Sequence, residues 1–252
     1  AFNKHEGAFY IPWGTNTELF TPKNIGKYTQ PVFFHSAGMG GINLRKGTDL
    51  LVKAFDKLAG EAKLVIHSQV PVSAYGDVTY TIINNENIEF VEKSVAPPGL
   101  YHMGNIYVYP TRLEGIGLTI CEALAMGLPV ITTDNAPMNE FVVHGETGRL
   151  VDVEDYISRA DGYFWPQSII NENSLQKEMQ YFIDHFDEVV SYQSNARAAA
   201  EEQFNWSKNA VELLEVINRV DNMKKEKAPV LVNRALGYAF EQREKKWSFS
   251  AK

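Results

Sequence analysis

The chain has 252 residues, of which 44% are hydrophobic and 22% are charged, and its formal net charge is -7. This length is enough for one large or two small domains with a sizeable core. The negative charge argues against non-specific binding to nucleic acid or to an anionic membrane, because both attract positive charge. Cys121 is the single cysteine. It excludes an internal disulfide and fits a reducing compartment, so we expect a cytoplasmic protein.

From residue 31 onward the sequence predicts strands that alternate with helices. Residues 1–30 are rich in Gly, Pro, Asn and Thr and are predicted to be a linker or lead-in. Short runs of apolar and β-branched residues predict the strands. These are 31–35, 64–67, 88–91, 106–109 and 129–133, with 79–84 as a further short piece. The alternation indicates an α/β fold, in which helices cover both faces of a parallel sheet.

Helices are predicted where apolar residues recur with helical spacing. The first spans 49–59 and has Thr48 or Asp49 as its cap. Further helices are predicted at 97–103, 174–185, 187–203 and 207–220. Between them, 152–173 is an acidic and aromatic insert. Because it has neither a strand context nor a histidine, we interpret it as a solvated loop and not as a metal site.

A glycine-rich segment follows the first predicted strand. A dinucleotide fingerprint would place glycines at positions 38, 40 and 43, but Asn43 occupies the third position. The sequence therefore gives no support to a nicotinamide cofactor. The segment ends in Arg45 and Lys46, just before the 49–59 helix, where an ammonium group can reach a pyrophosphate.

The strongest functional pattern spans 106–127 and is typical of a strand, a tight loop and a helix. Gly115 and Gly117 leave the loop backbone open to a ligand. The helix begins at Leu118, and Gly127 suits its carboxyl end. A glycine-rich turn of this kind directs free backbone N–H groups and the positive helix end to one point. Such a point binds anions, most often phosphates.

Two carboxylates flank this point. Glu114 stands at the entrance of the loop, and Glu122 lies one turn into the helix. A carboxylate would repel a phosphate, so these two are predicted to accept hydrogen bonds from sugar hydroxyls on either side. The residues expected to hold the phosphates are Gly115, Ile116, Gly117, Leu118 and Thr119. The pattern therefore predicts a nucleotide sugar, with its diphosphate at the helix end and one glutamate for each sugar ring.

Glu114, seven residues and Glu122 resemble the E-x7-E signature of the retaining family-4 glycosyltransferases, which have the GT-B fold. Three further blocks resemble that family in its order: 11–20, Lys46 with Gly47, and 145–151. The resemblance covers roughly residues 9–220. It implies the donor-binding half of a GT-B fold, a Rossmann-like parallel sheet flanked by helices. A C-terminal helical extension is expected to follow this half.

The resemblance also implies the reaction, which is transfer of a sugar from a nucleotide diphosphate sugar to an acceptor with retention. It implies that Glu114 binds the hydroxyls of the donor sugar and stabilises the positive charge at the anomeric carbon. It also implies that Glu122 binds the ribose and that Lys46 binds the diphosphate. The family's second cation stands five residues before the lysine, where this chain has Gly41. Either Arg45 substitutes for this cation or the glycine-rich loop supplies N–H groups instead, and the alternative interpretation of Arg45 is a solvated surface charge. We expect no metal and no other cofactor, because Lys46 and the helix end neutralise the diphosphate.

The base is expected at the carboxyl end of the 88–91 strand, since ligands of α/β sheets bind at that edge. The resemblance implies backbone contacts there. The candidate residues are Val91, Glu92, Lys93 and Ser94. An ordinary polar turn is the alternative interpretation. The base itself stays open between UDP-, GDP- and ADP-linked donors.

The resemblance covers one of the two Rossmann-like domains between which a GT-B enzyme works. We therefore expect 1–30 to be an interdomain linker and 31–221 the donor domain of an enzyme whose N-terminal domain is missing here. Without it the isolated chain is expected to lack activity. The basic, aromatic extension 222–252 either crosses to that domain, touches a membrane surface or is disordered. A non-catalytic nucleotide-sugar-binding or assembly subunit, a GT-B phosphorylase and an NDP-sugar epimerase stay open as other functions.

Overall fold

The structure is a computed structural model and describes residues 9–39, 45–158 and 165–222. The glycine-rich residues 40–44 and the basic tail 223–252 lie outside the described residues. Contacts divide the chain into a larger unit, Tyr10–Ala210, and a smaller unit formed by the residues on either side of it. Within the described ranges, no helix combines the length and apolarity that a bilayer crossing requires.

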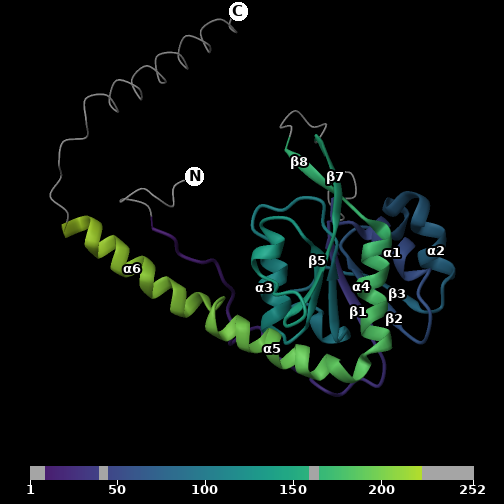
Figure 1. The fold of residues 1–252 in the computed structure, drawn as a ribbon, viewed down its shortest axis with the longest axis horizontal. Coiled ribbons are helices and arrows are strands. Elements are labelled where there is room, and N and C mark those ends of the chain that lie inside the picture. Colours follow the sequence, from purple (N-terminus) through teal and green to yellow (C-terminus); the bar gives the residue numbers. More distant parts are fainter. Residues whose placement is uncertain (1–8, 40–44, 159–164, 223–252) are drawn as a thin grey trace, which may run out of the picture. The chain divides into compact units, whose positions relative to one another are not determined.

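A six-stranded parallel sheet forms the centre of the larger unit (Figure 1). Its strands are β1 (Val32–Gly38), β2 (Lys63–Ser68), β3 (Ile88–Glu92), β4 (Ile106–Tyr109), β5 (Val130–Thr133) and β6 (Gly148–Val151). They lie in the order β3-β2-β1-β4-β5-β6. The chain therefore moves outward from β1 to β3 and then returns to place β4 on the other side of β1. Ligands of α/β sheets bind beside such a reversal, at the carboxyl ends of the strands.

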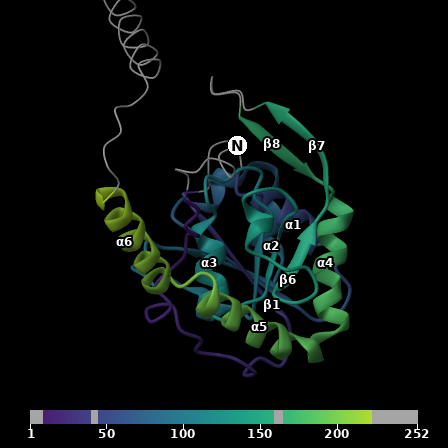
Figure 2. The same cartoon turned by 60° about the vertical axis from the view of Figure 1, so that its left-hand side comes forward.

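Helices cover both faces of this sheet, as predicted. The α-helices are α1 (Thr48–Phe55), α2 (Thr79–Asn84), α3 (Leu118–Ala125), α4 (Glu172–Asp184), α5 (Val189–Glu202) and α6 (Trp206–Asn222). Short 3₁₀ helices are η2 (Val72–Val78), η3 (Tyr101–Met103), η4 (Met138–Glu140) and η5 (Phe186–Glu188). Helix α1 packs against α4, and α3 packs against α5. Figure 1 shows α3 on one side of the sheet and α1, α2 and α4 on the other, and Figure 2 gives the turned view.

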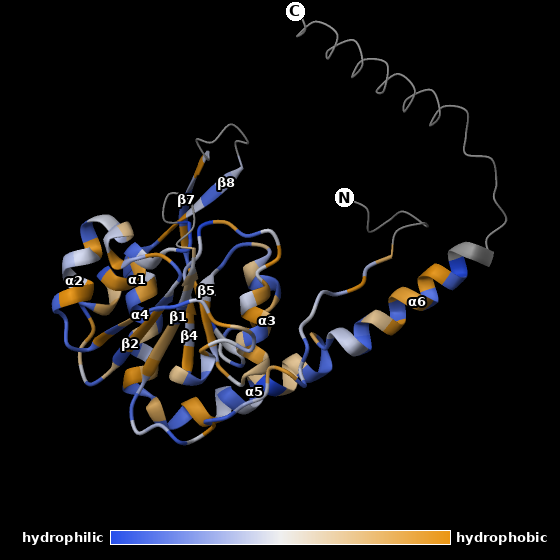
Figure 3. Ribbon diagram, turned by 180° about the vertical axis from the view of Figure 1, so that it is seen from behind, coloured by the Kyte–Doolittle hydropathy of each residue, from blue (hydrophilic) through white to orange (hydrophobic). Residues whose placement is uncertain are grey.

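The central strands are buried on both faces, and Figure 3 shows their apolar residues in orange. In β4, Ile106 and Val108 join the apolar layer that contains α1 and α4. Tyr107 and Tyr109 alternate with them and join the layer that contains α3 and α5. Because successive side chains of a strand point to opposite faces, β4 places both tyrosines beneath α3.

The start of helix α1 differs from the prediction. Neither Thr48 nor Asp49 caps it, and the N-cap is Gly47, which has a left-handed φ of 74°. Both side chains have other partners. Thr48 Oγ1 lies 2.8 Å from Nε2 of the buried His35, and Asp49 accepts two hydrogen bonds of 2.8 Å from Arg112. Tertiary partners therefore replace the local capping bonds that the sequence suggested.

Two other segments were assigned imperfectly from the sequence. The piece 79–84 is helix α2, with Ile82 buried and Tyr80 exposed, and it is not part of the sheet. In 97–103 only η3 is helical. The two prolines that open this segment have no N–H group to donate within a helix, which explains the shorter element.

The predicted loop 152–173 is also a correction, because most of its described residues lie in two paired β-strands. Strands β7 (Val153–Ser158) and β8 (Pro166–Ile170) pair antiparallel. Strand β7 is largely exposed, so its sequence lacks the apolar alternation that would have predicted a strand. On β8, Ser168 and Ile170 are buried and tie the hairpin to the rest of the unit.

The segment before β1 is part of the larger unit. The backbone N–H of Thr15 donates to the carbonyl oxygen of Phe204 at 2.8 Å, and the N–H of Trp206 donates to that of Thr15 at 3.0 Å. Gly14 lies so close that an added Cβ would come within 2.3 Å of the Phe204 carbonyl oxygen. Around Gly14 and Thr15, the predicted lead-in is thus held against the chain that enters α6.

Candidate functional site

The predicted site residues gather at the carboxyl ends of β1 and β4, beside the reversal in strand order. Arg45 and Lys46 follow β1, and the loop with Glu114 follows β4. Helix α3 starts directly after that loop and carries Thr119 and Glu122. The fold therefore brings two chain segments that are far apart in sequence to one place, as the motif predicted.

Glu114 is the centre of a charged cluster. Its Oε1 accepts hydrogen bonds from Lys46 Nζ at 2.7 Å and from an Arg45 guanidinium nitrogen at 2.8 Å. The hydroxyls of Tyr109 and Thr111 donate to the same oxygen at 2.6 Å and 3.0 Å. The cluster holds two cations against one carboxylate, so it carries one net positive charge. Arg45 belongs to it, which disfavours the interpretation of Arg45 as a solvated surface charge.

Burial and the neighbouring charges together shift the pKa values of Glu114 and Lys46. Burial alone raises the pKa of Glu114, but the nearby Lys46 and Arg45 and the hydrogen bonds from Lys46 and Tyr109 bring this pKa below its ordinary value. Burial also lowers the pKa of Lys46, against the attraction of Glu114. The Lys46 side chain is 16% exposed and that of Glu114 is 10% exposed. Both therefore lie at the surface of the site with little water around them.

The start of helix α3 is open. Its N-cap is Gly117, with a left-handed φ of 85°, no side chain caps it, and its first turn has no acidic residue. An added Cβ on Gly115 would meet no atom within 4 Å. Ile116 and Leu118 are 36% and 41% exposed. The loop thus presents its backbone to the surface beside the positive helix end, where an anion can approach.

Glu122 lies in an adjoining pocket of about 160 Å³. The lining residues are Phe20, Phe34, Ser36, His67, Val95, Pro97, Pro98, Gly99, Leu100, Tyr101, Thr119 and Glu122. Tyr101 donates a 2.5 Å hydrogen bond to Oε2 of Glu122, and burial raises the pKa of Glu122. Thr119 Oγ1 is buried, with the hydroxyls of Tyr107 and Tyr109 as its polar neighbours. The pocket is mainly apolar, with a small number of polar groups, as is usual for sites of small organic ligands.

None of the residues predicted for the base lines this pocket. Val91 is part of β3, and Glu92, Lys93 and Ser94 are exposed. The predicted base loop is connected to the pocket indirectly, through His67. Nε2 of this lining residue lies 2.7 Å from the Lys93 carbonyl oxygen. Sequence reasoning missed His67 and 95–100. The paired prolines directly after the predicted base loop were the signal that could have pointed to them.

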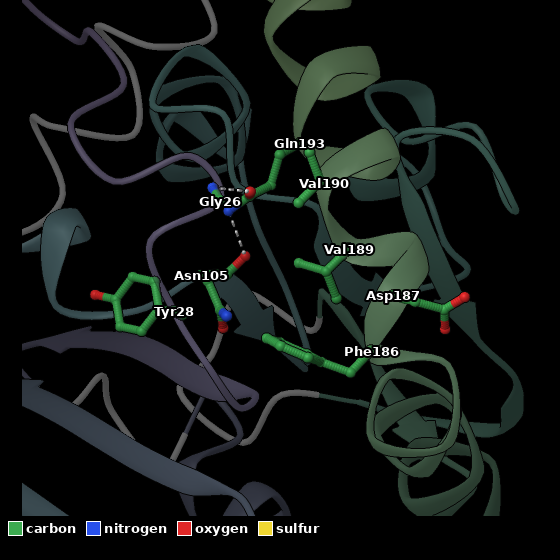
Figure 4. Close-up of a pocket in the computed structure, with 8 residues that line it drawn as sticks. All are labelled: Gly26, Tyr28, Asn105, Phe186, Asp187, Val189, Val190 and Gln193. Carbon is green, nitrogen blue, oxygen red and sulfur yellow. Dashed lines mark hydrogen bonds between the residues drawn. The ribbon is translucent and has the colours of Figure 1, made fainter.

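A second pocket, of about 140 Å³, lies at the opposite edge of the sheet, where β1 and β4 begin (Figure 4). Its lining residues are Gly26, Tyr28, Asn105, Phe186, Asp187, Val189, Val190 and Gln193. Gln193 already bonds to the Gly26 N–H at 3.3 Å and to the Asn105 carbonyl oxygen at 3.4 Å. The pocket contains none of the predicted site residues. In the described part of the chain, no three His, Cys, Asp or Glu side chains form a group that could hold a metal ion.

A comparison with models of known protein families shows which family the chain matches. The family model described as "Glycosyl transferases group 1" matches residues 31–162, which is more than half of the chain. The chain belongs to the group 1 glycosyl transferases. The matched range contains the charged cluster, the start of α3 and every residue that lines the pocket around Glu122 except Phe20.

Curated members of this family are longer than the chain. It is 30% identical over 144 residues to the capsular polysaccharide biosynthesis glycosyltransferase CapM of Staphylococcus aureus, covering 55% of this chain and 37% of CapM. It is 28% identical over 179 residues to a D-inositol 3-phosphate glycosyltransferase of Pseudarthrobacter chlorophenolicus, covering 63% and 43%. The chain thus spans less than half the length of these two group 1 relatives.

Solved glycosyltransferase structures share the fold. Sucrose-phosphate synthase of Thermosynechococcus elongatus superposes with a TM-score of 0.66 and 22% identity, covering 85% of this chain and 53% of that chain. The Anabaena protein HepE, in complex with UDP and glucose, gives a TM-score of 0.63 with 18% identity, covering 82% and 55%. These likenesses confirm the predicted Rossmann-like fold of a GT-B glycosyltransferase.

Proposed function

We propose that this chain is the donor-binding half of a retaining family-4 glycosyltransferase, which transfers a sugar from a nucleotide diphosphate sugar to an acceptor. One observation carries the proposal. Lys46, Arg45 and the uncapped start of α3 converge beside two glutamates, one in the charged cluster and one in the adjoining pocket. An anion site flanked by two hydrogen-bond acceptors is complementary to a diphosphate flanked by two sugars.

In this proposal the diphosphate lies between Lys46 and the N–H groups of residues 115–119, with Arg45 as the second cation. Glu122 accepts hydrogen bonds from the ribose hydroxyls, so the base occupies the pocket beyond it. The donor sugar then lies on the side of Glu114. Complexes of the Anabaena neighbour with UDP and with UDP-glucose support the choice of a nucleotide sugar as ligand.

The proposed reaction uses these groups at the bond that breaks. The bond between the anomeric carbon and the diphosphate oxygen breaks, and the electron pair leaves with the diphosphate. The nucleophilic atom of the acceptor forms the new bond to the anomeric carbon, and its proton passes to the departing diphosphate. Lys46 and the start of α3 stabilise the negative charge that develops there, and Glu114 stabilises the positive charge at the anomeric carbon. We propose that no metal is needed for this step. The acceptor site and its N-terminal Rossmann-like domain belong to the part of the protein beyond this chain, which spans about half of its solved neighbours.

Calorimetric titration with UDP, GDP and ADP, without and with magnesium, tests the proposal. We expect saturable binding of one nucleotide without the metal. The nucleotide that binds, and its sugar derivative, then serve for the variants. Glu122→Gln is expected to weaken both ligands equally, by roughly tenfold, because a hydrogen bond to a charged group contributes about 1.5 kcal/mol. Glu114→Gln is expected to spare the free nucleotide and to weaken the nucleotide sugar relative to it, by roughly tenfold.

The structure makes the second expectation sharper. Glu114 forms ion pairs with both Lys46 and Arg45, so its removal leaves both cations free for the diphosphate. Free nucleotide should therefore bind Glu114→Gln at least as tightly as it binds the wild type. Equal losses of both ligands in both variants would contradict the assigned roles. A folded chain that binds none of the three nucleotides would overturn the proposal.

Lys46→Met provides a separate test of the diphosphate position. Methionine keeps the length of the side chain but removes the charge, so we expect roughly thirtyfold weaker binding of the nucleoside diphosphate, from a loss of about 2 kcal/mol. Binding of the corresponding nucleoside should not change. Lys53→Met is the control, since Lys53 lies on α1 in an exposed ion pair with Asp77. If both lysine variants bind the diphosphate like the wild type, Lys46 is not its ligand.

A further inference from the structure

Three buried tyrosines form a row beneath the two glutamates of the site. Tyr101 comes from η3, and Tyr107 and Tyr109 come from β4. The ring centroids of Tyr101 and Tyr107 are 5.5 Å apart, and those of Tyr107 and Tyr109 are also 5.5 Å apart. All three rings pack in the apolar layer of α3, so they share one environment.

The hydroxyls of this row differ in their partners. Tyr101 donates to Oε2 of Glu122 at 2.5 Å, and Tyr109 donates to Oε1 of Glu114 at 2.6 Å. The hydroxyl of Tyr107 is buried, its polar neighbours are Thr119 and the Ser36 backbone, and it donates to neither glutamate. The outer tyrosines thus each hold one glutamate, and the middle tyrosine holds neither.

We propose that Tyr101 is a positioning residue for Glu122. It fixes one carboxylate oxygen from below, so that the other oxygen is presented to the pocket where the ribose would bind. Aromatic neighbours hold the ring in place, with Phe20, Phe34 and Tyr107 at centroid distances of 6.1 Å, 5.5 Å and 5.5 Å. A glutamate side chain otherwise rotates about several bonds, and a fixed donor removes that freedom before the ligand arrives. This inference rests on the proposed nucleotide site.

Tyr101 also keeps Glu122 able to accept hydrogen bonds. Burial raises the pKa of Glu122, and the hydrogen bond from Tyr101 opposes that rise. Burial holds the pKa of Tyr101 itself well above its ordinary value, so Tyr101 keeps its proton and is the donor. The other titratable groups around Glu122 are Tyr107 below it, Cys121 on its own helix and His67 across the pocket. Without Tyr101, Glu122 would be protonated at a higher pH.

The test compares Tyr101→Phe with Tyr107→Phe, which removes the same atom from the same row at a position that holds neither glutamate. Calorimetry uses whichever of UDP, GDP and ADP binds the wild type, between pH 5.5 and 8. Tyr101→Phe is expected to bind roughly tenfold more weakly at neutral pH, and its deficit should grow as the pH falls. Tyr107→Phe should stay within about twofold of the wild type throughout. Ratios to the wild type cancel the ionisation of the nucleotide phosphate, which all three proteins experience alike.

A double-mutant cycle shows whether Tyr101 acts through Glu122. If it does, Tyr101→Phe has no further effect in a Glu122→Ala background, where the acceptor of the Tyr101 hydroxyl is gone. The positioning role is refuted if Tyr101→Phe binds like Tyr107→Phe at every pH, or if it weakens binding equally in both backgrounds. Absence of nucleotide binding by the wild type would instead refute the proposed function, so the two failures are distinguishable.

Discussion

Replacing Gly47 with alanine is expected to lower the free energy of unfolding by about 3 kcal/mol. Gly47 has a φ of 74°, and a Cβ at this position would lie 2.0 Å from the Pro110 carbonyl oxygen. That oxygen has little room to move, because the next part of its loop is bonded to the segment before Gly47. The N–H of Arg112 donates to the Arg45 carbonyl oxygen at 2.8 Å, and Thr111 Oγ1 donates to it at 3.1 Å.

Gly115→Ala is the matched control for Gly47→Ala. It lies in the same site, but an added Cβ would meet no atom within 4 Å and its φ is outside the left-handed region. We expect its free energy of unfolding to stay within about 0.5 kcal/mol of the wild type. Denaturation in urea measures both variants. Equal stability of the two variants would show that the contact between Gly47 and Pro110 is not as tight as the structure has it.

Acidification is expected to destabilise the protein through His35, which lies buried beneath Lys46 and Thr48. Burial lowers the pKa of His35 to about 4. The unfolded chain takes up the proton near pH 6.5, and the folded protein does so only near pH 4. His35 therefore contributes its full stability above about pH 6.5, and this contribution is lost as the pH falls toward 4. The difference in pKa corresponds to about 3 kcal/mol.

His35→Gln isolates this contribution. A glutamine side chain cannot gain a proton, so the variant lacks the His35 component of the pH dependence. Carboxylates with lowered pKa values, such as Glu114, titrate in both proteins and cancel in the comparison. Denaturation curves at several pH values should show the stability difference between the two proteins shifting by about 3 kcal/mol in favour of the variant, between pH 7 and pH 4. If the stabilities of the two proteins instead changed with pH in parallel, His35 would have the same pKa in the folded and the unfolded state.

Much of the fold and the motif was predictable, because the residues that determine each element lie close together in the sequence. The apolar run of β4, the glycines after it and the helical spacing of α3 lie within 106–127, and the structure has these elements where they were predicted. The hairpin β7–β8 was not predictable in this way. Its exposed strand has no apolar alternation, and pairing across an insert depends on a partner that the sequence does not mark.

The sequence named candidate residues for the site but did not indicate their contacts. The motif named Lys46, Glu114 and Glu122, whose roles stay predictions, and it did not suggest that Glu114 accepts hydrogen bonds from Lys46, Arg45 and Tyr109. The base loop was placed at 91–94, whereas the pocket is lined by the residues after it. Such details depend on how loops pack once the strands are in order, which a single sequence does not determine.

The order of the strands has a consequence for assembly. Lys46 and Glu114 are 68 residues apart in sequence, and they meet because β4 pairs with β1, while β2 and β3, which lie between them in the sequence, occupy the other side of β1. Closing a loop of that length loses chain entropy, so we expect this pairing to be slow relative to local structure. We therefore expect the site to form late in folding, because no single β-α-β unit of the chain contains it. Nucleotide binding would stabilise only molecules in which that long-range pairing is complete, and its recovery during refolding would mark the arrival of the native topology.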